Sequence, residues 1–445
     1  MKQQIQLSDH FTYSRLIRFT LPSICMMIFT SVYGMVDGFF VSNIVGKTAF
    51  ASVNLIIPFL QILGGVGAML GIGGSALVAK TLGEGNIPKA RRYFTMMMYL
   101  MLGTSIFFTV VGVSVLRPVA YLFGATDAMI GDVMTYGTIC LLFNTALQAQ
   151  YTFQSYLIVA EKPKLALGVV IAAGVSNMIM DYVLIAVIPM GIAGAALATG
   201  LSQCVAGIIP LIWFLSRKNQ SALRFTKTTF AIKPMLLACG NGASEMLSSV
   251  SGSVTGILYN LQLMKYAGED GVAAYGVVMY AAFIFLGIFN GYSQGSSPIV
   301  GYHYGAKNHK EMKNILKRSL VMLASSAVVL TALAILLARP LASIFVGYDG
   351  KLLDMTTHAF KICAVPFLVM WFNMYTSCFF TALNDGVVSA AISFMRALVL
   401  PVLCIIVMPM IWELDGVWYS LAGSEILGVF VSFAFLLGKR KKYNY

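Results

Sequence analysis

The sequence predicts an all-α polytopic membrane protein, with twelve transmembrane helices in two six-helix bundles related by a pseudo-twofold axis along the membrane normal. Composition is the first of three observations that predict it. The 445-residue chain is 58% hydrophobic and 11% charged, with a mean hydropathy of +0.82, whereas soluble domains carry about 25% charged residues. The other two observations are a series of long apolar runs and a repeat that relates the two halves of the chain.

The apolar runs are long enough to cross a bilayer, which takes about 20 residues. We expect twelve spans, at residues 15–43, 50–80, 92–116, 128–160, 165–188, 191–216, 232–263, 271–303, 314–338, 355–383, 387–411 and 416–438. Basic residues concentrate at the start of the chain, in every second loop and at its end. The positive-inside rule then places both termini in the cytoplasm of a multi-pass protein of the plasma (inner) membrane.

The same pattern of basic residues bears on other classes of protein. A net charge of +13 could indicate a nucleic-acid partner, but orientation of the spans accounts for the basic residues, so no such partner is expected. The seven cysteines lie in apolar segments without paired spacing, and the four histidines are scattered. No nucleotide-binding loop, nucleophile elbow or metal-ligand motif is present. We therefore expect no enzyme and no cofactor other than a coupling ion.

A repeat divides the chain at its longest polar connection. Residues Gly74-Ser75, Gly83 and Asn86 recur as Gly295-Ser296, Gly305 and Asn308, with one residue inserted. GIAGAALATG at Gly191 has a weaker match in GVWYSLAGSE at Gly416, and residues 160–163 lie opposite 382–385. The predicted domains are an N-terminal six-helix lobe (1–217), a cytoplasmic linker (218–231) and a C-terminal six-helix lobe (232–445). Because each lobe has an even number of spans, the symmetry axis runs along the membrane normal, as in parallel transporter repeats.

Two acids lie inside spans of the first lobe. Counted from the basic residues that begin their spans, Asp37 and Asp181 lie roughly 28 Å and 25 Å along helices of the same direction. Asn177 shares a helix face with Asp181, and Thr199 lies about two turns into the next span. Such oxygens suit one Na⁺ or a shared proton. The alternative for Asp181 is an anchor at the outer end of its helix.

In the second lobe, Glu245 is the only acid that we place well inside the membrane. It stands in the segment GNGASEMLSSVSGS, whose small residues also allow close helix packing. We expect Glu245 to contact a cation or a cationic substrate. Arg396 and Asn373 are further polar candidates, although Arg396 can also extend its side chain to the membrane edge.

Several of these segments resemble the multidrug and toxic compound extrusion (MATE) transporters. They are Pro22 followed fifteen residues later by Asp37, the loop GGSALVAKTLGEGNIPKARR, and SNMIMDYVLI followed by GIAGAALATGLSQ. The resemblance covers essentially the whole chain. It implies a first-lobe cation site at Asp37, Asn177, Asp181, Thr199 and, where a fourth-helix amide of the family falls, Gln154. Glu245 is similar to an acid found on helix seven in part of the family.

Some positions of this sequence depart from the family pattern, and one proline gives the first span a point at which it can bend. Gln154 stands where Asn is common, and Ile158 and Glu161 replace the Arg and Gly that usually end the fourth-helix pattern. Pro22 removes a helix hydrogen bond and lets the first span bend.

We therefore expect a monomeric secondary active multidrug efflux transporter that exports small organic compounds, cationic or amphipathic, across the lipid bilayer. Exchange for H⁺ or Na⁺ would drive this export by alternating access. The nearest alternative is a lipid-linked saccharide or lipid flippase of the same superfamily, for which a basic cavity is expected. An intramembrane enzyme and a channel are more distant alternatives. The sequence leaves the substrate and the choice of ion open.

Overall fold

The computed structural model describes residues 5–347 and 349–445, so the first four residues of the predicted N-terminal lobe lie outside the described part. Its regular elements are all helical. In chain order they are α1 (Tyr13–Phe40), η1 (Val41–Val45), α2 (Lys47–Gly83), α3 (Ile87–Leu122), α4 (Ile130–Leu142), α5 (Asn144–Val159), α6 (Pro163–Asp181), η2 (Tyr182–Val187), α7 (Gly191–Leu215), α8 (Ile232–Gly305), α9 (His309–Leu336), α10 (Ala338–Val346), α11 (Gly350–Ala364), α12 (Phe367–Ala382), α13 (Gly386–Phe394), η3 (Met395–Val399) and α14 (Leu400–Tyr443), where η denotes a π-helix.

The number of spans follows from helix length and from two breaks. Within the described residues, eight helices are long and apolar enough to cross a membrane, and two bent pairs raise the number to ten. The helix Gly386–Tyr443 has 58 residues, or about 87 Å, which is far longer than one span needs. It breaks at Glu413 (φ 49°), and α8 breaks at Gly268 (φ 61°). With α14 divided at Glu413 and the first part of α8, before Gly268, counted as a helix of its own, the described residues form twelve long helices or bent helix pairs, which matches the predicted number of spans.

Two of the predicted spans, 128–160 and 355–383, are bent. The pair α4 and α5 bends by 52° at Phe143, and the pair α11 and α12 bends by 47°. Pro366 lies at the second bend and has no N–H to continue the helix. By contrast, α1 continues as one helix through Pro22, which is buried.

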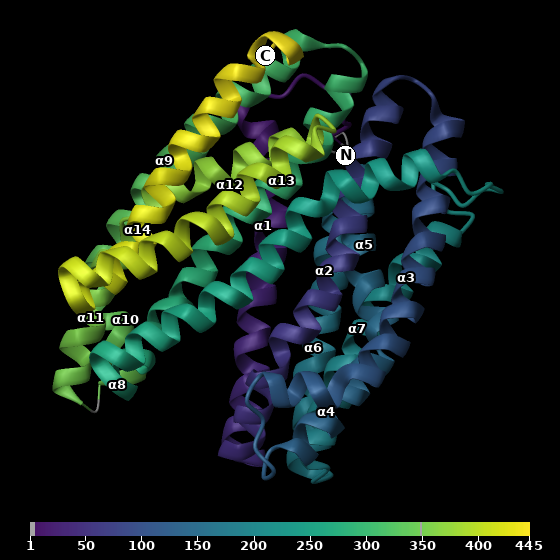
Figure 1. Ribbon diagram of the computed structural model, residues 1–445. Coiled ribbons are helices and arrows are strands. Elements are labelled where there is room, and N and C mark those ends of the chain that lie inside the picture. The colour runs from purple at the N-terminus through teal and green to yellow at the C-terminus, as the bar shows by residue number, and fades with distance from the viewer. Residues whose placement is uncertain (1–4, 348) are drawn as a thin grey trace.

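The two halves of the chain form two bundles with both chain ends at the same end of the molecule (Figure 1). We call this the termini end. Helices α2–α7 lie on one side, and the green-to-yellow helices α9–α14 lie on the other. The connection between α7 and α8 contains no helix.

The turns confirm the internal repeat. Asn86 caps α3 by accepting a hydrogen bond from the N–H of Lys89 (3.1 Å), and Asn308 caps α9 by accepting one from the N–H of Glu311 (3.1 Å). The residues just before these caps, Gly85 and Lys307, both have positive φ angles of 77° and 54°. The same backbone turn is therefore built in both halves.

The sequence match of residues 160–163 with 382–385 was wrong by one residue. Glu161 has a φ of 61° between α5 and α6, and Asn384 has a φ of 58° between α12 and α13. The structural partner of Glu161 is therefore Asn384, whereas the sequence alignment paired Glu161 with Leu383. The residue with left-handed backbone conformation fixes the register of this turn, and the amino-acid sequence alone does not show which residue that is.

At the termini end, glycines allow helices of the two lobes to pack closely against each other. A Cβ added to Gly83 would lie 1.9 Å from the carbonyl oxygen of Tyr302, and one added to Gly305 would lie 1.9 Å from that of Lys80. Each glycine therefore meets the carbonyl three residues before the other, as the two sides of a twofold contact must. This mutual contact places the pseudo-twofold axis between α2 and α8.

The same helices touch again farther from the termini. A Cβ on Gly73 would lie 2.1 Å from the carbonyl oxygen of Ala238, and one on Gly242 would lie 2.0 Å from that of Met69. Side chains do not fit between helices at these distances, so the lobes are in backbone contact. The molecule is thus closed over this part of α2.

Candidate functional site

The first-lobe site centres on two carboxyl groups. Asp37 of α1 and Asp181 at the end of α6 are close enough for their carboxyl groups to interact. Asp181 is fully buried. Neither of its oxygens, nor Oδ1 of Asp37, receives a hydrogen bond from a donor in the described residues. Because two ionised carboxylates only accept hydrogen bonds, the pair needs a proton or a cation between its oxygens.

Asn177 and Thr199 border this pair. Asn177 lies one turn before Asp181 on the buried face of α6, and its Oδ1 has no donor within the described residues. The hydroxyl of Thr199 is buried on α7 and faces Tyr136 of α4. Tyr136 in turn is close enough to Asp37 to interact with its charge. Three helices, α1, α6 and α7, thus bring unpaired oxygen atoms toward one region, and α4 adds Tyr136 beside them.

Gln154 is the predicted residue that the structure does not connect with the pair. Its side chain is 8% exposed on α5, and no hydrogen bond among the described residues joins it to either acid. Gln150, one turn earlier, lies within hydrogen-bonding range of Tyr33, which also interacts with Asp37. Gln150, which the sequence did not single out, is therefore the α5 amide that the contacts link to the site, through Tyr33.

Both π-helical segments of the first lobe begin just after the site. Segment η1 starts four residues beyond Asp37, and η2 starts directly after Asp181. A π-helix widens the backbone turn and is frequent at functional sites. The sequence carried no signal for either segment.

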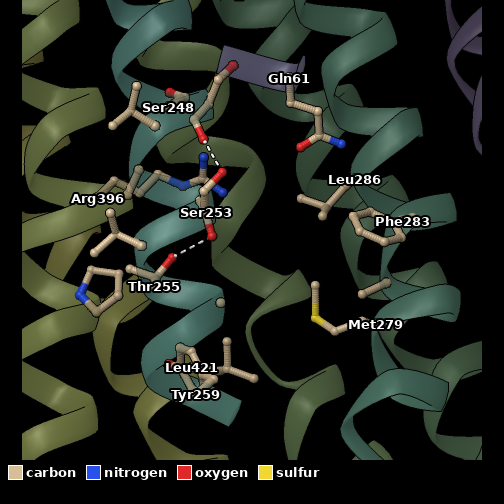
Figure 2. A pocket seen from close by; sticks show the side chains of 18 of the residues that line it. Gln61, Ser248, Ser253, Thr255, Tyr259, Met279, Phe283, Leu286, Arg396 and Leu421 are labelled. Carbon is tan, nitrogen blue, oxygen red and sulfur yellow. Dashed lines mark hydrogen bonds between the residues drawn. The ribbon is translucent and has the colours of Figure 1, made fainter. Parts of the chain in front are cut away.

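A cavity of about 1130 Å³ lies between the lobes. First-lobe residues in its wall come from α2, such as Gln61, and from the end of α3, Leu122 and Phe123. The second lobe supplies the rest, including Met279 and Phe283 (Figure 2). Because α3 ends opposite the termini, the cavity reaches toward the end that the glycine contacts do not close.

Glu245 lines this cavity from α8, as a substrate-contacting acid would. Its carboxylate makes no hydrogen bond or ion pair with another described residue. The expectation that it is the only acid deep in the second lobe was wrong. Glu425 of α14 also lines the cavity. It is the tenth residue of the predicted span 416–438. Counting residues along this span, as was done for Asp37, would therefore have placed Glu425 inside the membrane.

Glu425 pairs with Arg396. The guanidinium Nη2 lies 2.8 Å from Oε1 of Glu425, and Nε lies 3.0 Å from the same oxygen. The Nδ2 of Asn373 donates to Oε2 of Glu425 (2.9 Å), and Oδ1 of Asn373 accepts from Ser432 (2.8 Å). Arg396 therefore does not extend to the membrane edge, and Asn373 holds Glu425 in place.

Comparisons with known proteins agree with this architecture. The MatE family model matches residues 22–183 and 246–406, once in each half of the chain. The multidrug export protein MepA of Staphylococcus saprophyticus is 23% identical over 422 residues, which cover 93% of this chain and 91% of that protein.

Two solved structures share the fold. An outward-facing multidrug resistance MATE transporter of the MOP superfamily has a TM-score of 0.93 at 20% identity, covering 100% of this chain and 99% of that chain. A MATE protein in complex with MaL6 has a TM-score of 0.93 at 19% identity, with both chains covered completely. The chain therefore belongs to the MatE family and is a multi-pass membrane transporter, not an enzyme.

Proposed function

We propose that the protein is a secondary active exporter of organic cations and amphipathic compounds, driven by an inward flow of H⁺ or Na⁺ through the Asp37–Asp181 pair. The observation that carries this proposal is the pair of carboxyl groups, fully buried at Asp181, that has no hydrogen-bond donor among the described residues. Asn177 and Thr199 would add neutral oxygens to a bound Na⁺. No hydrogen bond among the described residues supports a role for Gln154.

Coupling requires the ion and the substrate to favour different conformations, because a ligand with equal affinity for both shifts nothing. The structure supports alternating access: the glycine contacts close one end, and the cavity reaches toward the other. A continuous channel does not fit this closure. In Pro22, α1 has a point at which one helix hydrogen bond is missing. Bending there would reshape the first-lobe site during transport.

The cavity supports an organic substrate. Its volume of about 1130 Å³ exceeds the range of about 300–1,000 Å³ that is usual for small-molecule sites. Methionine and aromatic side chains in its wall suit varied apolar groups. Glu245 would contact the positive charge. The relative MepA is named a multidrug export protein, which agrees with this substrate class.

The flippase alternative receives less support from the cavity. A pyrophosphate-linked lipid would require several basic side chains, but Arg396 is the one basic residue among the described cavity-lining residues, and Glu425 occupies it.

We also propose that both termini are cytoplasmic and that the transporter works as a monomer in the inner membrane. A cysteine at the exposed Lys218 should react with an impermeant thiol reagent only after the inner side is opened, and a reporter near Asp349 should be external. Asn219 is unsuitable for labelling because it is buried and donates to the carbonyl oxygen of Leu223.

Proteoliposomes test the function directly. Purified protein should accumulate a cationic dye against its gradient when a pH or Na⁺ gradient is imposed, and the gradient that drives accumulation identifies the ion. Absence of dye movement under both gradients, with protein that is folded and inserted, would exclude the proposed activity.

A further inference from the structure

We propose that the Arg396–Glu425 ion pair sets the net charge of the cavity and thereby makes the transporter selective for organic cations with one positive charge. This inference rests on the proposed export of organic cations and specifies how many positive charges the preferred substrate carries. Three charged side chains are found among the described residues that line the cavity, Glu245, Arg396 and Glu425. Their formal sum is one negative charge.

The ion pair is built into the lobe from three elements. Arg396 stands in η3, Asn373 in α12, and Glu425 in α14. A Cβ added to Gly428 would lie 2.8 Å from Nδ2 of Asn373, so the tight packing of α14 fixes the amide that holds Glu425. The side chains of Arg396 and Glu425 are only 20% and 12% exposed. Their arrangement is therefore part of the fold and not a chance surface contact.

Arg396 faces the site of the substrate. It points into the pocket toward the part of α8 that carries Ser248 and Ser253 (Figure 2). It is also close enough to Glu245 to interact with its charge. Because Glu425 already holds Nε and Nη2 of the guanidinium, the uncompensated charge of the cavity belongs to Glu245.

The selectivity follows from the cost of unpaired charge in a cavity with mostly apolar walls. A substrate with one positive charge neutralises Glu245. A substrate with two positive charges leaves one of them uncompensated, because Glu425 is already neutralised by Arg396. Arg396 thus acts as a fixed internal cation that neutralises the second acid of the cavity, Glu425.

The count predicts opposite effects for the two single variants. Arg396→Gln frees Glu425 and gives the cavity two negative charges, so dications gain relative to monocations. Glu425→Gln leaves Arg396 to balance Glu245, so both cations lose relative to neutral amphipathic compounds. The double variant Arg396→Gln/Glu425→Gln again has one negative charge and should recover the selectivity of the parent.

Ethidium and propidium provide matched probes, because they share a ring system and carry one and two positive charges. Competition between the two dyes in proteoliposomes should favour ethidium in the parent. Arg396→Gln should shift the ethidium-to-propidium ratio at least tenfold toward propidium, whereas the double variant should remain within threefold of the parent.

An independent variant covers the case in which Arg396→Gln does not fold. Gln61→Glu adds one negative charge from the opposite wall of the cavity (Figure 2) without touching the ion pair. It should produce the same shift toward propidium, and Gln61→Asn should not. Unchanged ratios in Gln61→Glu and in every folded single variant would overturn the inference. A parent protein that moves neither dye under any gradient would instead refute the proposed function.

Discussion

At the scale of single residues, the carboxyl pair of the first lobe is the feature on which transport should depend. Asp37→Asn keeps the size of the side chain but removes the charge that a proton or Na⁺ must balance. Uphill export should fall at least tenfold, while downhill exchange of substrate continues. The measurement compares gradient-driven uptake with counterflow at matched protein density.

The control for this variant is Asp127→Asn, since Asp127 is an exposed acid in the loop after α3 and takes no part in the pair. It should transport like the parent. Uphill export by Asp37→Asn and by Asp181→Asn at the rate of the parent would remove the pair from the coupling mechanism.

Asp385 provides a pH test outside the spans. Burial favours its neutral form, but hydrogen bonds from Tyr443 and Lys442 outweigh this and hold the pKa of the carboxyl below its ordinary value. A lowered pKa in the folded state stabilises the protein above the unfolded value of about 3.9, and this contribution is lost as the pH falls through the folded pKa. The melting temperature of the parent should therefore drop at acidic pH.

In Asp385→Asn the melting temperature should be lower at neutral pH, and the difference from the parent should shrink as the pH falls below about 4. Thermal unfolding in detergent between pH 3 and 7 measures this. A constant difference across that range would show that the hydrogen bond from Tyr443, at 2.5 Å, does not depend on the charge.

At the scale of elements, apolar runs and depth along a helix carried most of the prediction. The twelve spans and the facing positions of Asp37 and Asp181 follow from a bilayer of fixed thickness and a constant rise per residue. The bend at Phe143 and the π-helical segments did not follow, because they depend on packing between helices distant in sequence. Glu425 was missed for a different reason: the depth count was not applied to its span.

Glycine contacts between α2 and α8 give the prediction at this scale. In Gly83→Ala the new methyl group would overlap the carbonyl oxygen of Tyr302. Overpacking costs about 1–3 kcal/mol, or roughly a fivefold to hundredfold change in an equilibrium, since about 1.4 kcal/mol is tenfold. The equilibrium between the two conformations should shift by this factor away from the one that is closed at the termini end.

Labelling measures this shift. Ala79 is fully buried, so in a background without reactive cysteines a thiol at Ala79→Cys should react faster when Gly83→Ala is added. The matched control is Gly103→Ala, because a Cβ there meets nothing within 4 Å. Equal labelling rates in all three proteins would mean that α2 and α8 accommodate the methyl group without separating.

At the scale of the whole molecule, the segment before α1 joins the two lobes. The N–H of Leu7 donates to Oε1 of Glu161 in the first lobe (2.7 Å), and the N–H of Phe11 donates to Oε1 of Glu311 in the second (2.8 Å). Both apolar side chains are buried, at 2% and 0% exposure. The segment therefore spans the closed end and must loosen from one lobe when that end opens.

The fixed end of this segment is the better one to test, because Glu311 holds it through several bonds. Besides Phe11, its carboxylate accepts from Asn314 (2.8 Å) and lies 2.7 Å from Nδ1 of His10. Glu311→Gln removes the charge that strengthens these bonds, and hydrogen bonds to a charged group contribute about 1.5–3 kcal/mol. The termini end should open more often, so Ala79→Cys should be labelled several-fold faster.

Asp354→Asn is the control for Glu311→Gln, since Asp354 also forms an ion pair, with Arg339, but its side chain is 68% exposed and lies away from the segment. Exposed pairs contribute little, so this change should leave the labelling rate as it is. If Glu311→Gln melts at a lower temperature without faster labelling, the segment stabilises the second lobe alone. Faster labelling at an unchanged melting temperature would identify it as the strap that keeps the closed end shut.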